Sequence, residues 1–409
     1  MLSELKKVRF PVEIGLLLAF CLFLPLLEFW KNFALLGYLI AWLMNRQRAR
    51  DFGGPWRTAD TLVLLWIGAA YLAAAFAGLE GHAVAKTGDV AASAVLFWTV
   101  MRAGYAGREC VWLLGALVAS TLIGLAIGYA RLWSGIGKSG TLQLYSVGHV
   151  NHTAIYLAMM LGVCAAWLFA RWRAWPGNRR TVALSIFALM LVSLVVTASR
   201  GAVGIGVLLV LVLALAWWPR WRTPLAASAV AVAVMAAVLA GFGAEVLRKQ
   251  ADNVAAQNVL SFRDGIWRMG LVGWEKYPWF GVGKDNYGLI TQERVRAWRA
   301  EAGKDYDPAL YVHFPHGHNL YVNTLVERGA VGLASLLVVL LAALAALLRH
   351  RPRAGDGDID WLLWGGAASA WFVTVGVGTV NTTLHHEHGL LAALLFGLWL
   401  STLHTRRAS

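Results

Sequence analysis

The amino-acid sequence predicts an all-α polytopic membrane protein with about twelve transmembrane helices. Of its 409 residues, 59% are hydrophobic and only 14% are charged, about half the charged fraction of a soluble domain. Uncharged stretches close to the roughly 20 residues that a helix needs to cross the hydrocarbon layer recur along the whole chain. Basic residues separate these stretches in an alternating pattern, which predicts how the helices are oriented.

Twelve apolar stretches are the candidate transmembrane helices, and the second and fourth of them are short. Nine precede the longest polar segment and three follow it, so we predict a division into residues 1–242, 243–318 and 319–409. The predicted spans are Val12–Leu27, Phe33–Met44, Thr61–Leu79, Val90–Met101, Val111–Ala130, Thr153–Ala170, Val182–Ala198, Ala202–Trp218, Leu225–Phe242, Leu320–Leu348, Trp361–Val380 and Gly389–Leu403.

Basic residues in the short connections favour the cytoplasmic side of a membrane. If both chain ends are cytoplasmic, the cytoplasmic segments hold 20 of the 36 Lys and Arg residues, and the short outer loops hold few. We therefore predict cytoplasmic N- and C-termini. The net charge of +14 follows from this topology, and because the basic residues are dispersed between spans it gives little support to nucleic-acid binding.

Residues 243–318 interrupt the apolar pattern and are predicted to form a long outer loop. A loop of this length without secondary structure is unusual in a compact protein, and such loops are usually functional. The Ser-Phe-Arg-Asp sequence at positions 261–264 has capping-box spacing, which predicts a helix that begins there. Arg263, Trp267 and Gly270 would share one face of this helix. Arg263 would lie in its first turn, where free backbone N–H groups favour anions.

The apolar stretch from Val182 to Trp218 would be roughly 55 Å long as one helix, which is too long for a single crossing. Basic clusters flank both of its ends, so we predict a hairpin with its apex on the outer side. Its only charged residue, Arg200, marks that apex. An isolated charge between two spans is a candidate functional residue, and the alternative is an arginine that snorkels to the membrane interface.

Histidines gather on the same predicted face. Nine of the eleven histidines fall on the outer side, and His316 and His318 lie where the tenth span opens. On a regular helix these two side chains would point about 200° apart, so that only one could face a shared cavity. The topology thus assigns Arg200, Arg263 and His318 to one membrane face although they are far apart in sequence.

These motifs resemble those of the O-antigen ligase and polymerase superfamily. The sequence TASRG at positions 197–201 resembles the Ser-Arg-Gly element of that superfamily. Positions 263–267, followed by YPWFGVG at 277–283, resemble its arginine and Pro-x-x-Gly-x-Gly elements. HGHN at 316–319, followed by ERGAVGL at 327–333, resembles its His-Asn and Glu-x-Gly elements. The resemblance implies a metal-independent GT-C-type glycosyltransferase without a cofactor, in the bacterial inner membrane, with a periplasmic active site.

The implied donor is an undecaprenyl-pyrophosphate-linked glycan, and the implied acceptor is the lipid A-core oligosaccharide. Arg200 and Arg263 can neutralise the diphosphate leaving group with planar, permanently charged donors, in place of a metal. His318 can act as the base for the acceptor hydroxyl, and an in-line displacement would invert the anomeric centre. We expect further substrate contacts from His316, Asn319, Trp267, Arg268, His149 and His152.

Several alternatives stay open at this point. The loop at positions 385–388 (HHEH) could bind zinc together with His316 and His318, but its spacing fits no standard pattern and favours a polar outer loop. His149 and His152 could line the cavity or only cap a helix. The same chemistry would serve an O-antigen polymerase or a protein O-oligosaccharyltransferase. A transporter is disfavoured because almost no charge lies in the middle of a span.

Overall fold

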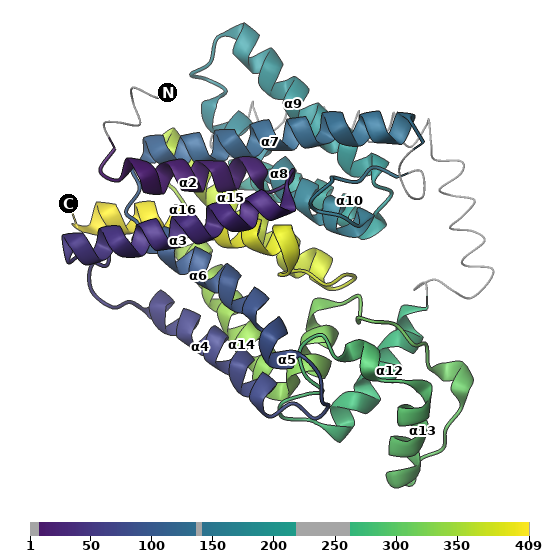
Figure 1. The fold of residues 1–409 in the computed structure, drawn as a ribbon. Helices are drawn as coiled ribbons and strands as arrows, with labels where there is room; N and C mark the ends of the chain where they lie inside the picture. Colours follow the sequence, from purple (N-terminus) through teal and green to yellow (C-terminus); the bar gives the residue numbers. More distant parts are fainter. Residues whose placement is uncertain (1–7, 136–140, 218–261, 409) are drawn as a thin grey trace.

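The computed structural model describes residues 8–135, 141–217 and 262–408, and these residues form helices and loops without a strand. Figure 1 shows the helices in chain order. They are α2 (Pro11–Phe23), α3 (Glu28–Ala49), α4 (Thr58–Ala75), α5 (Ala83–Lys86), α6 (Gly88–Arg102), α7 (Gly107–Trp133), α8 (Val150–Arg171), α9 (Gly177–Val196), α10 (Arg200–Ala216), α12 (Arg263–Lys276), α13 (Gln292–Glu301), α14 (Leu320–Arg349), α15 (Asp358–Gly378) and α16 (His386–Ala408), with the short 3-10 turns η3 (Tyr287–Leu289) and η4 (Pro308–Leu310).

Eleven of the twelve predicted spans coincide with helices, and the ninth, Leu225–Phe242, lies outside the described residues. Within the described part of the chain, seven helical segments are long and apolar enough to cross a membrane, and α2 and α10 are shorter apolar helices. The two spans that looked short are longer in the structure. The second lies in the 22-residue helix α3, and α5 and α6 together give a 20-residue apolar segment. The protein is an all-α polytopic membrane protein.

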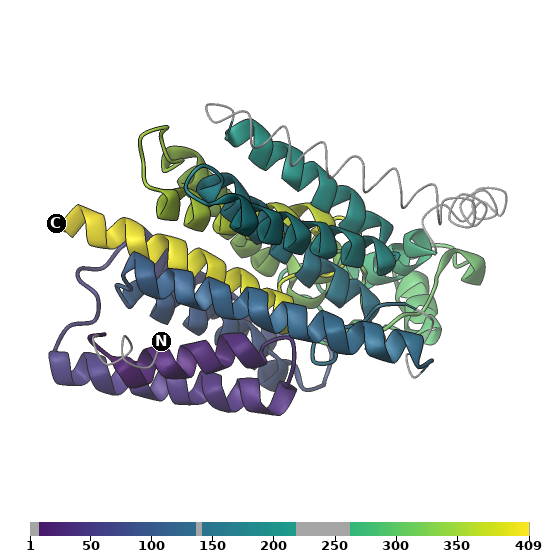
Figure 2. The same ribbon diagram turned by 90° about the horizontal axis from the view of Figure 1, so that it is seen from above.

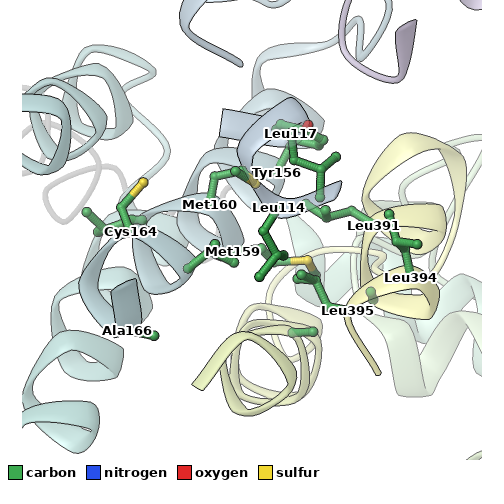
Figure 3. Packing of buried hydrophobic residues seen from close by; sticks show 14 of the residues in the cluster. Leu114, Leu117, Tyr156, Met159, Met160, Cys164, Ala166, Leu391, Leu394 and Leu395 are labelled. Atoms are coloured by element: carbon green, nitrogen blue, oxygen red, sulfur yellow. The ribbon is translucent and has the colours of Figure 1, made fainter. Parts of the chain in front are cut away.

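The centre of the helical bundle is α8. All its side chains from residue 153 to residue 166 are buried, as expected for a helix that is apolar on every face. It packs against α15, α10, α9 and α16. In Figure 3, Tyr156, Met159 and Met160 of α8 lie near leucines of α7 and α16. This enclosure fixes the N-terminal end of α8, where two of the predicted site histidines are located.

The predicted hairpin with Arg200 at its apex is confirmed. Helix α9 ends at Val196 and α10 begins at Arg200. Between them Ala198 adopts a left-handed backbone with φ of 56°. The Ser199 hydroxyl donates a hydrogen bond of 3.2 Å to the side-chain oxygen of Asn151, which ties the hairpin apex to the start of α8.

The described part of the predicted outer loop, from residue 262 onward, folds around a small core of its own. Helix α12 packs against α13 and against α14. Figures 1 and 2 show α12 and α13 at the end of the bundle opposite to the start of α2 and the end of α16. The buried side chains of this core are Ile266, Met269, Val272, Val282, Tyr287, Ile290, Val295, Tyr311 and Val326. The described part of the loop, from residue 262 onward, is therefore a folded unit.

A break inside α14 holds this unit in place. Gly329 has non-helical backbone angles (φ 65°, ψ −166°), which free backbone groups on both sides of it. The N–H of Val282 donates to the carbonyl of Val326, and the next N–H donates to the next carbonyl, both at 2.9 Å. Beyond the break, the N–H of Ala330 donates to the carbonyl of Pro278 at 2.8 Å. The segment at positions 278–283 thus replaces the missing helical hydrogen bonds.

Only glycine fits at this junction. A Cβ on Gly329 would lie 2.2 Å from the carbonyl oxygen of Trp279, and a Cβ on Gly281 would lie 2.5 Å from the carbonyl oxygen of Val326. Both glycines also have positive φ, which side chains rarely adopt. The Gly-x-Gly sequence at 281–283 is therefore a turn, and the Pro-x-x-Gly-x-Gly and Glu-x-Gly elements are the two halves of one backbone junction.

Candidate functional site

Three helix starts supply the predicted catalytic side chains. Arg200 begins α10, Arg263 begins α12, and His318 lies two residues before α14. The expected start of α12 is confirmed, but its N-cap residue is Phe262, whose φ is 60° and whose side chain makes no capping bond. The capping-box spacing thus predicted the start of the helix correctly. The N-cap residue Phe262, however, makes no side-chain capping hydrogen bond.

Arg263 lies near a second positive charge. Burial, followed by the charge of Arg200, lowers the pKa of the Arg263 guanidinium. Its Nε is buried and has no hydrogen-bond partner among the described residues. A buried donor without a partner is costly, and two neighbouring arginines repel each other. Both costs are relieved by an anion with several acceptor oxygens, such as a diphosphate.

His318 is held in an unusual backbone conformation with its ring half-buried. Its φ is 46°, in the left-handed region that non-glycine residues rarely adopt. Its Nδ1 is buried and has no hydrogen-bond partner in the described structure. Burial, then the charges of His316 and Arg263, lowers the pKa of His318 to about 4, although a hydrogen bond with the Asn381 side chain opposes this shift. The imidazole is therefore neutral near pH 7, with a nitrogen available to a substrate.

The expectation that the side chains of His316 and His318 point about 200° apart is wrong. It assumed a regular helix, but α14 begins at Leu320 and both histidines lie in the bend before it. Their ring centroids are 4.3 Å apart, and the ring of Phe314 is 4.7 Å from that of His318 and 5.1 Å from that of His316. His316 is therefore a direct neighbour of His318.

Asn319 and Trp267 hold the histidine segment in position. The side-chain oxygen of Asn319 caps α14 by accepting from the N–H groups of Tyr321 and Val322, at 2.9 and 3.0 Å. Its amide nitrogen donates to the carbonyl of Thr379 at 2.8 Å. The indole N–H of Trp267 donates to the Gly317 carbonyl at 2.6 Å. Because these polar atoms are bonded within the protein, both side chains position His318.

The three remaining predicted residues, His149, His152 and Arg268, lie in different surroundings. His149 caps α8, since its Nδ1 accepts from the N–H of Asn151 at 3.3 Å, and it also lowers the pKa of His316 and His318. Of the two roles that the sequence left open for His149, the structure shows the helix cap. His152 lies against the 385–388 loop, 4.8 Å from His385 between ring centroids. Arg268 is exposed on α12, and within the described chain no contact connects it to the other site residues.

Two residues at the site were not identified from the sequence. Asn381, which is buried, hydrogen-bonds to His318. Lys284 lies 3.4 Å from the carboxylate of Glu327, and it contributes to the lowered pKa of His316. Lys284 directly follows the Gly-x-Gly turn, a position that could have marked it as a third cation. Asn381 follows α15 without any motif, so only the fold reveals it.

Comparison with known proteins gives one match to a family. Residues 185–337 match the family described as O-antigen ligase. This region contains Arg200, Arg263 and His318, together with both halves of the backbone junction in α14. No curated protein matches the chain. Residues 185–337 of this chain are thus similar to the O-antigen ligase family.

Proposed function

We propose that this protein is an O-antigen ligase that transfers a glycan from undecaprenyl pyrophosphate to the lipid A-core oligosaccharide during lipopolysaccharide biosynthesis. The observation that carries this proposal is the pair of buried, unpartnered atoms, Arg263 Nε and His318 Nδ1, in the region that matches O-antigen ligases. A donor that suits a diphosphate and a neutral imidazole that suits a hydroxyl are the two groups that the transfer requires.

The proposed reaction is a single displacement at the anomeric carbon. The acceptor hydroxyl oxygen forms the new bond to this carbon, and the bond between the carbon and the diphosphate oxygen breaks. Undecaprenyl pyrophosphate leaves with the electron pair, and His318 takes the hydroxyl proton. Attack opposite to the leaving group inverts the anomeric configuration. Arg200 and Arg263 offset the negative charge that grows on the leaving diphosphate, so a metal is not needed at that position.

Binding of the donor is expected to make His318 a stronger base. A pKa of about 4 makes His318 a weak base in the free protein. The charge of Arg263 is one cause of this low pKa, and an arriving diphosphate offsets that charge. The pKa of His318 should therefore rise toward neutrality only when the donor is bound, which would tie proton transfer to a filled site.

The proposed location is the bacterial inner membrane, with a periplasmic site and both chain ends in the cytoplasm. Supporting this, the start of α2 and the end of α16 share one end of the bundle, opposite to α12 and α13. The alternation of basic residues along the sequence supports the same orientation. The arrangement suits a donor whose lipid stays in the bilayer while its diphosphate and glycan reach the water. An O-antigen polymerase or a protein O-oligosaccharyltransferase is the second candidate, because it would use the same donor chemistry. A transporter remains less favoured.

In the assay that tests the proposal, the purified full chain is placed in lipid nanodiscs. It is then given the lipid-linked glycan together with one of three acceptor conditions. These are lipid A-core oligosaccharide, a serine-rich peptide, or no second acceptor. The ligase proposal expects glycan transfer to lipid A-core alone. Elongation of the donor without a second acceptor would instead identify a polymerase, and a glycosylated peptide would identify a protein O-oligosaccharyltransferase.

A further inference from the structure

A second group of histidines lies beside the site. His152 on α8 and His385 and His388 near the start of α16 each present a ring nitrogen, and these nitrogens lie within 4.8 Å of one another. The ring centroids are 4.8 Å apart for His152 and His385, 4.9 Å for His385 and His388, and 5.4 Å for His152 and His388. The three residues come from segments that are more than 200 positions apart in sequence, and the fold alone brings them together.

His388 is the most informative member of this group. Its side chain is completely buried, with 0% of its surface exposed. Both ring nitrogens lack a hydrogen-bond partner within the described chain. A buried imidazole always has one N–H and one lone pair to satisfy, and leaving a buried polar group unpaired costs about 1–3 kcal/mol. A further ligand at this position would remove part of that cost.

The other ring nitrogen of His385 is already oriented. Its Nε2 lies 3.0 Å from the carbonyl oxygen of Thr382, and because a carbonyl only accepts, this nitrogen carries the proton. The lone pair of Nδ1 is then available to a ligand. Histidines that bind metals commonly donate their second N–H to a backbone carbonyl in this way.

We propose that His152, His385 and His388 bind one divalent transition-metal ion, of which zinc fits best. Three neutral imidazoles suit zinc, copper or nickel, whereas magnesium and calcium prefer oxygen ligands. Zinc–nitrogen bonds of about 2.0–2.1 Å place tetrahedral ligand nitrogens about 3.3 Å apart. The separations between the ring nitrogens, now up to 4.8 Å, would therefore need to shorten by up to about 1.5 Å.

This site differs from the zinc alternative that the sequence suggested. That alternative joined the 385–388 loop to His316 and His318, whereas the structure joins the loop to His152 on α8. The ion would therefore not occupy the place of the diphosphate. It would clamp the loop to α8, the most enclosed helix of the bundle.

Asn381, which hydrogen-bonds to His318, lies four residues before His385 in the connection between α15 and α16. A buried ion pair between Lys31 and Glu387 also holds the start of α16 in place. A metal at the three histidines would thus position the segment that supports the proposed base. Its role is structural, and metal binding can be measured without any substrate.

The test measures metal in the full chain, purified with a tag that contains no histidine. After dialysis against buffered Zn²⁺, elemental analysis should find one zinc per chain, and Co²⁺ should give the visible absorption bands of a four-coordinate site. His388→Ala and His152→Ala should each lower Zn²⁺ affinity by at least tenfold. His386→Ala is the matched control in the same loop, because His386 is exposed and outside the group, and it should keep one zinc per chain.

Two results would overturn the proposal. One is a wild-type chain that binds neither Zn²⁺ nor Co²⁺ stoichiometrically, a result that does not depend on how any variant folds. The other is an affinity loss in His386→Ala as large as that in His388→Ala. Neither result bears on glycan transfer, so the metal site and the proposed function can fail separately.

Discussion

His318, Arg200 and Arg263 each lie at, or within two residues of, a strained piece of backbone. Seven non-glycine residues of the described chain have positive φ, and Ala198, Phe262 and His318 are among them. Such conformations typically cost about 1–3 kcal/mol each and persist where the surrounding structure enforces them. Here each one lies within two residues of the start of a helix, beside or at a residue that the sequence predicted for the site.

The low pKa of His318 predicts the pH dependence of the reaction. A base works only when it is unprotonated, so activity should fall as the pH drops through the pKa of the free enzyme. Because the pKa of His318 is lowered to about 4, by burial and by His316 and Arg263, kcat/KM should stay nearly constant from pH 7.5 to pH 6. An acid limb with its midpoint at 6.5 or above contradicts this environment for His318. Returning samples to pH 7 controls for unfolding in acid.

The two arginines predict a strong effect of a conservative change. Arg200→Lys and Arg263→Lys keep the charge but lose the planar fork that matches a diphosphate, so each should lower kcat/KM by at least tenfold. Arg296→Lys on α13 is the control, since Arg296 is exposed and makes no contact within the described residues. Transfer rates near the wild-type value in both site variants would contradict diphosphate binding by Arg200 and Arg263. They would instead indicate that both arginines snorkel to the membrane interface.

The sequence located these three residues through topology and motifs, because charges are rare beside apolar spans and stand out there. Asn381 could not be found in this way. It is an uncharged residue outside every motif, and its bond to His318 depends on how α15 and α16 pack. The pairing of His152 with His385 also depends on packing and is invisible in the sequence.

At the scale of elements, the junction between the segment at 278–283 and the break in α14 positions the whole outer unit. It explains why the two glycine-containing motifs occur together although about 50 positions separate them. Hydropathy predicted the helices because each apolar stretch must satisfy its backbone within the membrane. It could not predict the break at Gly329, since the sequence there remains compatible with a continuous helix.

The junction predicts a large loss of stability in Gly329→Ala. The new Cβ would lie 2.2 Å from the carbonyl oxygen of Trp279, so the backbone of the junction must separate. Gly303→Ala is a matched control, because Gly303 has the same φ of 65° but nothing within 4 Å of the added Cβ. We expect Gly303→Ala to cost about 1–2 kcal/mol and Gly329→Ala clearly more, measured by thermal unfolding in detergent. Equal unfolding midpoints for the two variants would contradict the junction.

At the scale of the whole molecule, the outer unit and the first and last helix ends lie at opposite ends of the bundle. The start of α2 and the end of α16 lie at one end, and α12 and α13 lie at the other (Figures 1 and 2). The alternation of basic segments along the sequence predicted such a division. The same statistics cannot describe how the helices surround α8, because burial within a membrane bundle depends on shape and not on hydropathy.

This division predicts which introduced cysteines react with an impermeant thiol reagent in intact cells. The three native cysteines are buried and should stay unlabelled. Ala302→Cys, in an exposed turn after α13, should be labelled from the periplasm. Gly177→Cys and Gly355→Cys, at open positions near the opposite end, should be labelled only after the membrane is permeabilised. Labelling of Gly177→Cys in intact cells would show that the predicted orientation is wrong.

The most direct test of a transfer site built from two arginines and a histidine is the turnover of His318→Ala. With saturating donor and acceptor, loss of the base should lower the transfer rate by a factor of about 10² to 10⁴. Donor affinity should stay within a few-fold of the wild-type value, because Arg200 and Arg263 remain. His316→Ala should be milder. His82→Ala should match the wild type, because the His82 side chain is exposed and makes no described hydrogen bond. If His318→Ala transfers glycan at a rate within a few-fold of the wild type, His318 is not the base and the central claim is wrong.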